Sequence, residues 1–262
     1  MAVFLICVFL FSNSLPSIKQ IGLKEFIFGT KWKPSIDLYG IFPMIIGSIY
    51  VTCGAIIVGV PLGIMTSIFL SKFCPKKMQS CLKFAIDILS GIPSVVYGFF
   101  GLMLIIPFVK NTFGGNGYSI LSASILLGIM ILPTVISVAE SSLNAVPKSF
   151  YEGARALGTS HELSVFLCVV PACKSGLMAA VILAIGRAIG ETMAVIMVCG
   201  NQARIPNSVL KGVRTMTANI VIEMGYAADL HRNALIATGV VLFVFILIIN
   251  TCFSLIKNRK GN

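Results

Sequence analysis

Two ionisable residues interrupt an otherwise charge-free stretch and are the first candidates for chemistry. Arg187 and Glu191 are the only charged residues between positions 175 and 203. On one helix, residues four apart lie on the same face and can form an ion pair. Arginine presents a planar fork of N–H donors that suits a tetrahedral oxyanion. The pair therefore fits a path for an anion, with Glu191 neutralising Arg187 when the path is empty, and it fits equally a structural ion pair between helices.

The elements that must position this pair are membrane helices. Apolar residues make up 57% of the 262-residue chain and charged residues 11%, with a mean hydropathy of +0.97, whereas soluble domains carry about 25% charged residues. A membrane-spanning helix needs about 20 mainly apolar residues. We therefore expect an all-α integral membrane protein with six spans, at residues 1–15, 41–71, 91–109, 118–139, 175–200 and 233–256. Either the first span is short or the true start lies upstream of Met1.

The charge pattern sets the expected orientation. Lys257, Arg259 and Lys260 follow the last span, and basic residues favour the cytoplasmic side. An even number of spans then places both termini in the cytoplasm, together with the lysine-rich connection 72–90. The expected organisation is a first transmembrane helix and external segment (1–40), a transmembrane domain (41–256) with a cytoplasmic loop at 140–174, and a cytoplasmic tail (257–262).

Several function classes are disfavoured. The net charge of +11 resides in short connections between apolar spans, where topology and anionic lipid headgroups explain it without nucleic acid. The eight cysteines form no Cys-x-x-Cys pair, so we expect neither a metal nor a redox site. The sequence contains no P-loop motif, and it shows no convincing set of nucleophile, base and oxyanion donors. We expect no enzyme activity and no bound cofactor, so any transport by this chain must draw its energy from another subunit or from an ion gradient.

The loop at 140–174 contains a compact polar motif. The segment 152–157 can form a short helix that Gly158 ends in a left-handed conformation, and Thr159 or Ser160 can cap the next helix. Such an element suits a groove on a soluble partner. The segment resembles the EAA loop of importer-type ABC permeases, which contacts the ATPase subunit. The positions that carry the resemblance are Glu152, Gly153, Ala154, Gly158 and Pro171, with Gly153 in place of the usual alanine.

Five further segments narrow the resemblance to the PstC-type permease subunits of phosphate ABC transporters. The third-span signature contains Gly91, Pro93, Ser94, Tyr97 and Gly98. The fifth-span signature is 186–195, which includes Arg187 and Glu191. Shorter matches lie at 28–32, 222–225 and 231–235.

The resemblance implies a type I ABC importer permease fold (MetI-like) in the cell membrane of a bacterium or archaeon. It also implies a homologous PstA-type sister permease, two ATPase subunits that bind the ATP, an external phosphate-binding protein, and a role of Arg187 and Glu191 in phosphate passage. The alternatives are a permease for another oxyanion and a gradient-driven anion carrier. A carrier would be expected to show inverted repeats, and none is evident.

Overall fold

The computed structural model describes the backbone of residues 1–259 and the side chains of these residues except 2, 3, 6, 7 and 253–259. Nearly all regular structure in this part of the chain is helical. The exceptions are strands β1 (Trp32–Lys33) and β2 (Leu38–Tyr39), which form an antiparallel ribbon with Trp32 opposite Tyr39. Residues 260–262 of the expected tail lie outside the described residues.

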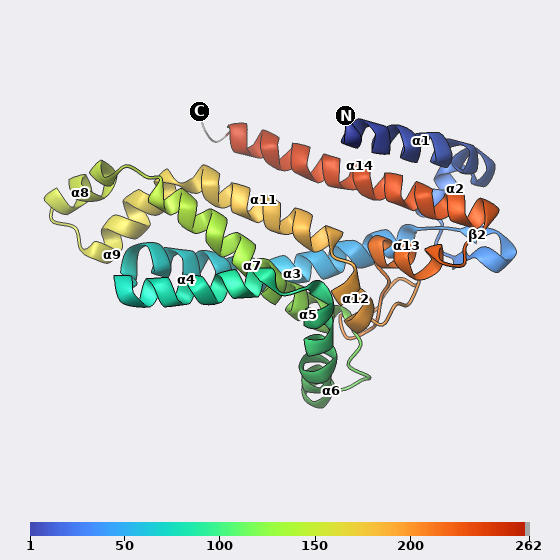
Figure 1. Ribbon diagram of the computed structural model, residues 1–262, viewed down its shortest axis with the longest axis horizontal. Coiled ribbons are helices and arrows are strands. Elements are labelled where there is room, and N and C mark those ends of the chain that lie inside the picture. Colours follow the sequence, from blue (N-terminus) through green and yellow to red (C-terminus); the bar gives the residue numbers. More distant parts are fainter. Residues whose placement is uncertain (260–262) are drawn as a thin grey trace. The chain divides into compact units, whose positions relative to one another are not determined.

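Figure 1 shows the order of the helices along the chain. Up to the middle of the chain they are α1 (Ala2–Ile21), α2 (Leu23–Phe28), α3 (Phe42–Ile68) with a π-helical continuation (Phe69–Phe73), α4 (Lys76–Gly91), α5 (Ser94–Phe100), a second π-helical turn (Gly101–Ile105), α6 (Ile106–Phe113) and α7 (Ile120–Asn144). After it they are α8 (Lys148–Ala156), α9 (His161–Ser164), a third π-helical turn (Val165–Val169), α10 (Val170–Ala172), α11 (Lys174–Gly190), α12 (Met193–Val198), α13 (Met216–Met224) and α14 (Asp229–Arg259).

Four of the expected spans are confirmed as helices long and apolar enough to cross a membrane. They are Phe42–Phe73, Ser94–Phe113, Ile120–Asn144 and Asp229–Cys252. The first expected span, 1–15, coincides with α1, some of whose side chains lie outside the described residues, so its crossing of the membrane stays a prediction.

The fifth expected span, 175–200, is not one continuous helix. Helix α11 ends at Gly190 and α12 begins only at Met193. A second break precedes α11, where the segments His161–Ala172 and Lys174–Gly190 meet at an angle of 69°. The expected span at 175–200 is therefore divided between α11 and α12, and the break falls at Glu191 and Thr192.

The described chain forms two compact units, each with its own core. The first unit comprises Met1–Gly54, Pro93–Leu127 and Ile189–Ile249, and the second comprises Ala55–Ile92, Gly128–Ala188 and the chain from Asn250 on. In the first unit, Ile18 and Ile21 of α1 pack against a buried cluster that includes Leu235 of α14, and Figure 1 shows these two helices side by side.

The second unit contains a buried cluster near the expected cytoplasmic loop and a helix with an unusual polarity. Ile68, Leu143, Val165, Val169 and Cys173 form the cluster.

Helix α4 occupies most of the connection expected at 72–90. It directs polar side chains inward onto the buried carboxylate of Glu140, and its large apolar side chains are exposed: Met78, Leu82, Phe84, Ile88 and Leu89.

Candidate functional site

Arg187 lies near the end of α11, in the second unit, with an exposed side chain. Its guanidinium donates a hydrogen bond from Nη1 to the hydroxyl of Thr134 on α7, over 3.3 Å. A single long bond to a neutral hydroxyl leaves most of the donor capacity of the guanidinium available. Most N–H donors of Arg187 therefore remain available to bind an anion.

Glu191 directly follows the end of α11 and belongs to the first unit, whose last segment begins at Ile189. Its Oε1 accepts hydrogen bonds from the backbone N–H groups of Thr192 (3.2 Å) and Ala194 (3.5 Å). The carboxylate thus satisfies N–H groups at the start of α12 that have no partner within that helix. Its backbone carbonyl accepts a bond from the hydroxyl of Thr217 on α13, over 3.2 Å.

These contacts correct the expected geometry of the pair. Arg187 and Glu191 do not occupy one helical face, because the helix ends at Gly190, between them. Carboxylates near a helix start compete for backbone N–H groups and favour caps over helix interiors. Each residue is anchored separately, by Thr134 in the second unit and by the start of α12 in the first.

The third-span signature packs against the segment that follows Glu191. Pro93 precedes α5, Ser94 begins it, and Tyr97 and Gly98 are buried. A Cβ atom at Gly98 would collide with Met197 and lie 3.3 Å from the Cα of Ala194, both on α12. Glycine is therefore required for the close approach of α5 to α12. Gly91, the last residue of α4, has open space where a Cβ atom would lie, and it belongs to the second unit.

The expected cytoplasmic loop has the predicted local structure. Helix α8 begins at Lys148, earlier than predicted, and Gly158 beyond its end adopts a left-handed conformation with φ of 85°. The side chain of Ser160 accepts a hydrogen bond from the backbone N–H of Leu163 and caps α9. The predicted helix, glycine turn and cap are confirmed. Glu152 and Gly153 are exposed, Ala154 faces inward, and Pro171 is an exposed residue of α10.

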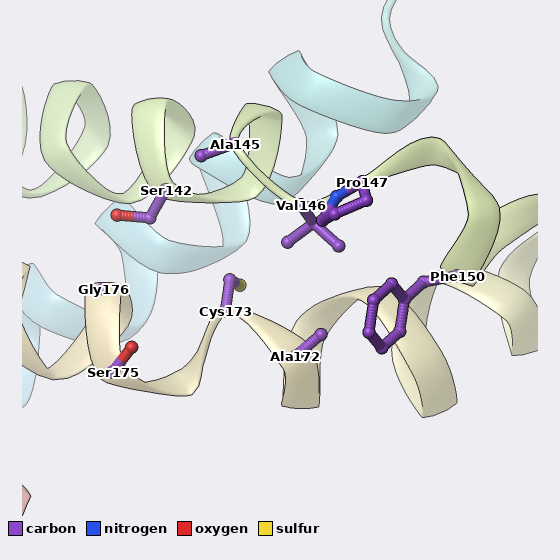
Figure 2. Close-up of a pocket in the computed structure, with 9 residues that line it drawn as sticks. All are labelled: Ser142, Ala145, Val146, Pro147, Phe150, Ala172, Cys173, Ser175 and Gly176. Atoms are coloured by element: carbon purple, nitrogen blue, oxygen red, sulfur yellow. The ribbon is translucent and has the colours of Figure 1, made fainter. Parts of the chain in front are cut away.

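A cavity of about 310 Å³ lies beneath the start of α8. Figure 2 shows Phe150 of α8 on one side of it, with Ala172 and Cys173 at the bend before α11 facing the end of α7. The remaining lining residues are Ser142, Ala145, Val146, Pro147, Ser175 and Gly176. The start of α8 therefore lies over open space in the second unit.

A buried polar cluster in the first unit was not assigned from the sequence. Glu223, at the end of α13, accepts hydrogen bonds at Oε2 from the indole N–H of Trp32 and from the ring of His231, both over 2.8 Å. Its Oε1 pairs with Arg214 over 2.5 Å, and Arg214 also donates to the side chain of Asn219 over 3.0 Å. We call Trp32, Arg214, Asn219, Glu223 and His231 the Glu223 cluster.

Two tyrosines near the Glu223 cluster have raised pKa values. Burial and the nearby carboxylate of Asp37 raise the pKa of Tyr39, whose ring packs edge-on against Trp32. Desolvation and the charge of Glu223 raise the pKa of Tyr226. The segments 28–32, 222–225 and 231–235 each contribute one residue to the Glu223 cluster. The sequence showed the three segments as separate matches and did not show that they meet.

In the part of the chain that the structure describes, no group of three or more His, Cys, Asp or Glu side chains is arranged to hold a metal ion. All seven cysteines with described side chains are free thiols.

Comparisons with known proteins converge on one class of membrane protein. Residues 59–260 match the family model described as binding-protein-dependent transport system inner membrane component. The chain is 38% identical over 255 residues to "Probable ABC transporter permease protein YqgH" of Bacillus subtilis, covering 93% of this chain and 82% of that protein. It is 33% identical over 265 residues to "Phosphate transport system permease protein PstC" of Mesorhizobium japonicum, covering 93% and 81%.

A third relative is archaeal. The chain is 33% identical over 272 residues to "Probable phosphate transport system permease protein PstC" of Methanocaldococcus jannaschii, covering 94% of this chain and 85% of that protein.

Solved structures share the fold. An inward-facing form of the MetNI methionine ABC transporter matches with a TM-score of 0.64 at 17% identity, covering 87% of this chain and 99% of that one. A bacterial alginate ABC transporter matches with a TM-score of 0.62 at 13% identity, covering 98% and 91%. The all-helical ABC importer permease fold expected from the sequence is confirmed.

Proposed function

The chain belongs to the family of inner membrane components of binding-protein-dependent transport systems, and we propose that it is the permease subunit of an ATP-driven importer of inorganic phosphate. The observation that carries the proposal is the similarity to proteins named phosphate transport system permease PstC along more than nine-tenths of this chain. The exposed guanidinium of Arg187, held by one neutral hydroxyl, supports the same cargo.

In the proposed mechanism, phosphate leaves an external binding protein and passes between this chain and a homologous PstA-type sister permease in the cell membrane. Arg187 donates N–H groups to the phosphate oxygens, which it can do in a bidentate manner. A charge within a membrane protein is costly unless it faces an aqueous path or a partner, so the exposed Arg187 marks that path. Because the binding protein selects the cargo, the permease needs only weak affinity.

Glu191 has a different role in this mechanism. Its carboxylate holds the start of α12, and its backbone carbonyl holds Thr217 of α13. The resemblance implies that the charge of Glu191 also lies on the phosphate path. Glu191 therefore shapes the path and its closure, and Arg187 contacts the cargo.

The energy comes from two ATPase subunits that bind ATP; this chain binds none. The exposed face of α8, with Glu152 and Gly153, enters a groove on an ATPase subunit, as the resemblance to the EAA loop implies. Closure of the ATPase dimer then pushes on α8 and switches the permease from inward-open to outward-open. Both termini are proposed to lie in the cytoplasm with the loop at 140–174.

Reconstitution in vesicles with the sister permease, the ATPase and the binding protein tests this function. We expect uptake of radiolabelled phosphate that requires ATP and all four components. Uptake that continues without the ATPase would identify a carrier or a channel. ATP-dependent uptake of sulfate in place of phosphate, with the matching binding protein, would identify a permease for another oxyanion.

A further inference from the structure

Helix α8 is tied to the body of the second unit through one histidine. Nδ1 of His161, on α9, lies 2.9 Å from the hydroxyl of Tyr151 on α8. Nε2 of the same ring lies 3.0 Å from the backbone carbonyl of Lys72, at the end of the π-helical continuation of α3. A carbonyl only accepts, so Nε2 carries a proton and donates it. In the neutral ring, Nδ1 then accepts from the hydroxyl of Tyr151.

The end of α3 leaves a carbonyl that needs such a donor. The last carbonyls of a helix have no partner within it. In the π-helical turn Phe69–Phe73, the N–H of Cys74 reaches back to the carbonyl of Phe69, and the carbonyl of Lys72 receives its bond from His161 instead. The rings of Phe73 and His161 pack in a T-shaped arrangement with the centroids 4.8 Å apart, so the imidazole has an aromatic contact in addition to the bonds at both nitrogens.

Open space surrounds this connection. A cavity of about 370 Å³ is lined by Ser71, Lys72, Tyr151, Glu152 and His161, among others. The cavity of about 310 Å³ in Figure 2 lies beneath Phe150, on the same helix. Two pockets that open to the surface therefore border α8. The hydrogen-bonded chain from Tyr151 to Lys72 is a direct connection from α8 to α3.

The helices on both sides of His161 are also suited to small shifts. The π-helical turn Phe69–Phe73 precedes Cys74, and the π-helical turn Val165–Val169 follows α9. Short π-helical segments occur frequently at functional sites and mark places where helix register is altered. Ile68, Val165 and Val169, from or beside these turns, belong to one buried cluster, with Tyr151 packed against it.

We propose that His161 is the positioning residue that transmits displacement of α8 to the end of α3, through the chain Tyr151–His161–Lys72. This rests on the proposed function, in which an ATPase subunit displaces α8. His161 contacts neither ATP nor phosphate in this proposal. Its role is to couple the movement of α8 to that of α3. Without His161, the complex should still hydrolyse ATP but transport less phosphate for each ATP.

The test compares phosphate uptake with ATP hydrolysis in the reconstituted complex. His161→Ala removes both hydrogen bonds, and Tyr151→Phe removes only the hydroxyl while the ring stays. We expect each variant to lower the phosphate transported per ATP about fivefold or more, since coupling between sites typically spans about 5–150-fold, while hydrolysis stays within about twofold of the parent complex. His161→Gln, whose amide can donate to the Lys72 carbonyl, should restore part of the ratio. Tyr50→Phe, at an exposed tyrosine of α3, is the matched control.

The outcomes are distinguishable. If the parent complex shows no ATP-dependent phosphate uptake, the proposed function fails. If the parent complex transports phosphate and Tyr151→Phe and His161→Ala both keep its ratio, the role of His161 is overturned. A fall of uptake and hydrolysis in equal proportion also overturns it, because that result means lost docking of the ATPase. Tyr151→Phe decides the matter if His161→Ala does not assemble, since phenylalanine keeps the packed ring.

Discussion

Trp32 donates its indole N–H to the buried carboxylate of Glu223 over 2.8 Å, although the two residues lie 191 positions apart. The bond joins the β1–β2 ribbon to α13, and His231 at the same oxygen adds α14. Three sequence segments that separately resemble phosphate permeases thus meet at one carboxylate. Because the opposite oxygen holds Arg214, Glu223 organises this side of the first unit.

Removing the Glu223 carboxylate should destabilise the protein strongly. Glu223→Ala leaves the nearly buried guanidinium of Arg214 without its charge partner, and we expect a loss of about 3 kcal/mol in the free energy of unfolding. Trp32→Phe, which removes one bond to a charged acceptor, should cost about 2 kcal/mol. Thermal unfolding in detergent measures both. Arg232→Ala, at an exposed neighbour of His231, should stay within about 0.5 kcal/mol.

The single tryptophan of the chain gives Glu223→Ala a second readout. Its emission should move to longer wavelength as the buried indole gains access to water. An unchanged emission maximum, with unchanged thermal stability, would contradict the assignment of Glu223 as the organising residue.

Arg187→Gln should abolish ATP-dependent phosphate uptake without preventing assembly of the complex. Glutamine preserves length and hydrogen bonding but lacks the charge and the fork of donors that bind an oxyanion. Thr134→Val, which removes the hydroxyl that orients the guanidinium, should have a smaller effect. Uptake assays and co-purification of the subunits separate the two properties. Survival of uptake in Arg187→Gln, or failure of assembly first, would contradict the role in the path.

Two substitutions at Glu191 distinguish its charge from its capping bonds. Glutamine keeps an oxygen able to accept from the N–H groups of Thr192 and Ala194, whereas alanine removes it. Loss of a cap typically costs about 1 kcal/mol, so Glu191→Ala should lower the unfolding temperature more than Glu191→Gln. If the charge also shapes the phosphate path, both variants should transport more slowly at equal expression. Normal transport by Glu191→Gln would limit the residue to the capping role.

The sequence was informative where a single physical demand dominates. Lipid requires long apolar helices with internally satisfied backbones, so four spans could be predicted within a few residues. The turn at Gly158 could be predicted because a left-handed residue at a helix end favours glycine. The sequence also predicted a cap at Thr159 or Ser160, residue types that typically precede a helix, and the structure shows Ser160 in that place.

Features that depend on distant contacts could not be predicted. Arg187 and Glu191 are spaced for one helical face, and the break between them depends on Thr217 and on the start of α12, which the local pattern does not show. Glu223 lies in the connection expected between the fifth and sixth spans, and its contact with Trp32, 191 positions away, is not visible in the local pattern. The inward polarity of α4 likewise follows from Glu140 on another helix.

Gly153 and Gly158 should respond oppositely to the same substitution. Gly153 lies inside α8 with open space where the methyl group of an alanine would lie, so Gly153→Ala should stabilise the helix by about 0.5–1 kcal/mol and keep transport. Gly158 has φ of 85°, so Gly158→Ala should cost about 1–2 kcal/mol and reduce ATP-dependent uptake. Thermal unfolding and uptake of the two variants, measured side by side, check the contrast. Equal tolerance at both positions would contradict the turn.

The inward face of α4 should be held by the interaction of Lys83 with Glu140. The ammonium lies 2.6 Å from Oε1 of the buried carboxylate, and the lysine side chain is 44% exposed. Because water screens a half-exposed charge, we expect a coupling free energy of about 1 kcal/mol in a double-mutant cycle of Lys83→Met and Glu140→Gln. Gln79 and Asn144 also approach this oxygen, so Glu140→Gln alone should be the more destabilising single change. Lys77→Met, at an exposed lysine of the same helix, should show no coupling to Glu140, and coupling as large as that of Lys83 would mean that the effect is a general one of net charge.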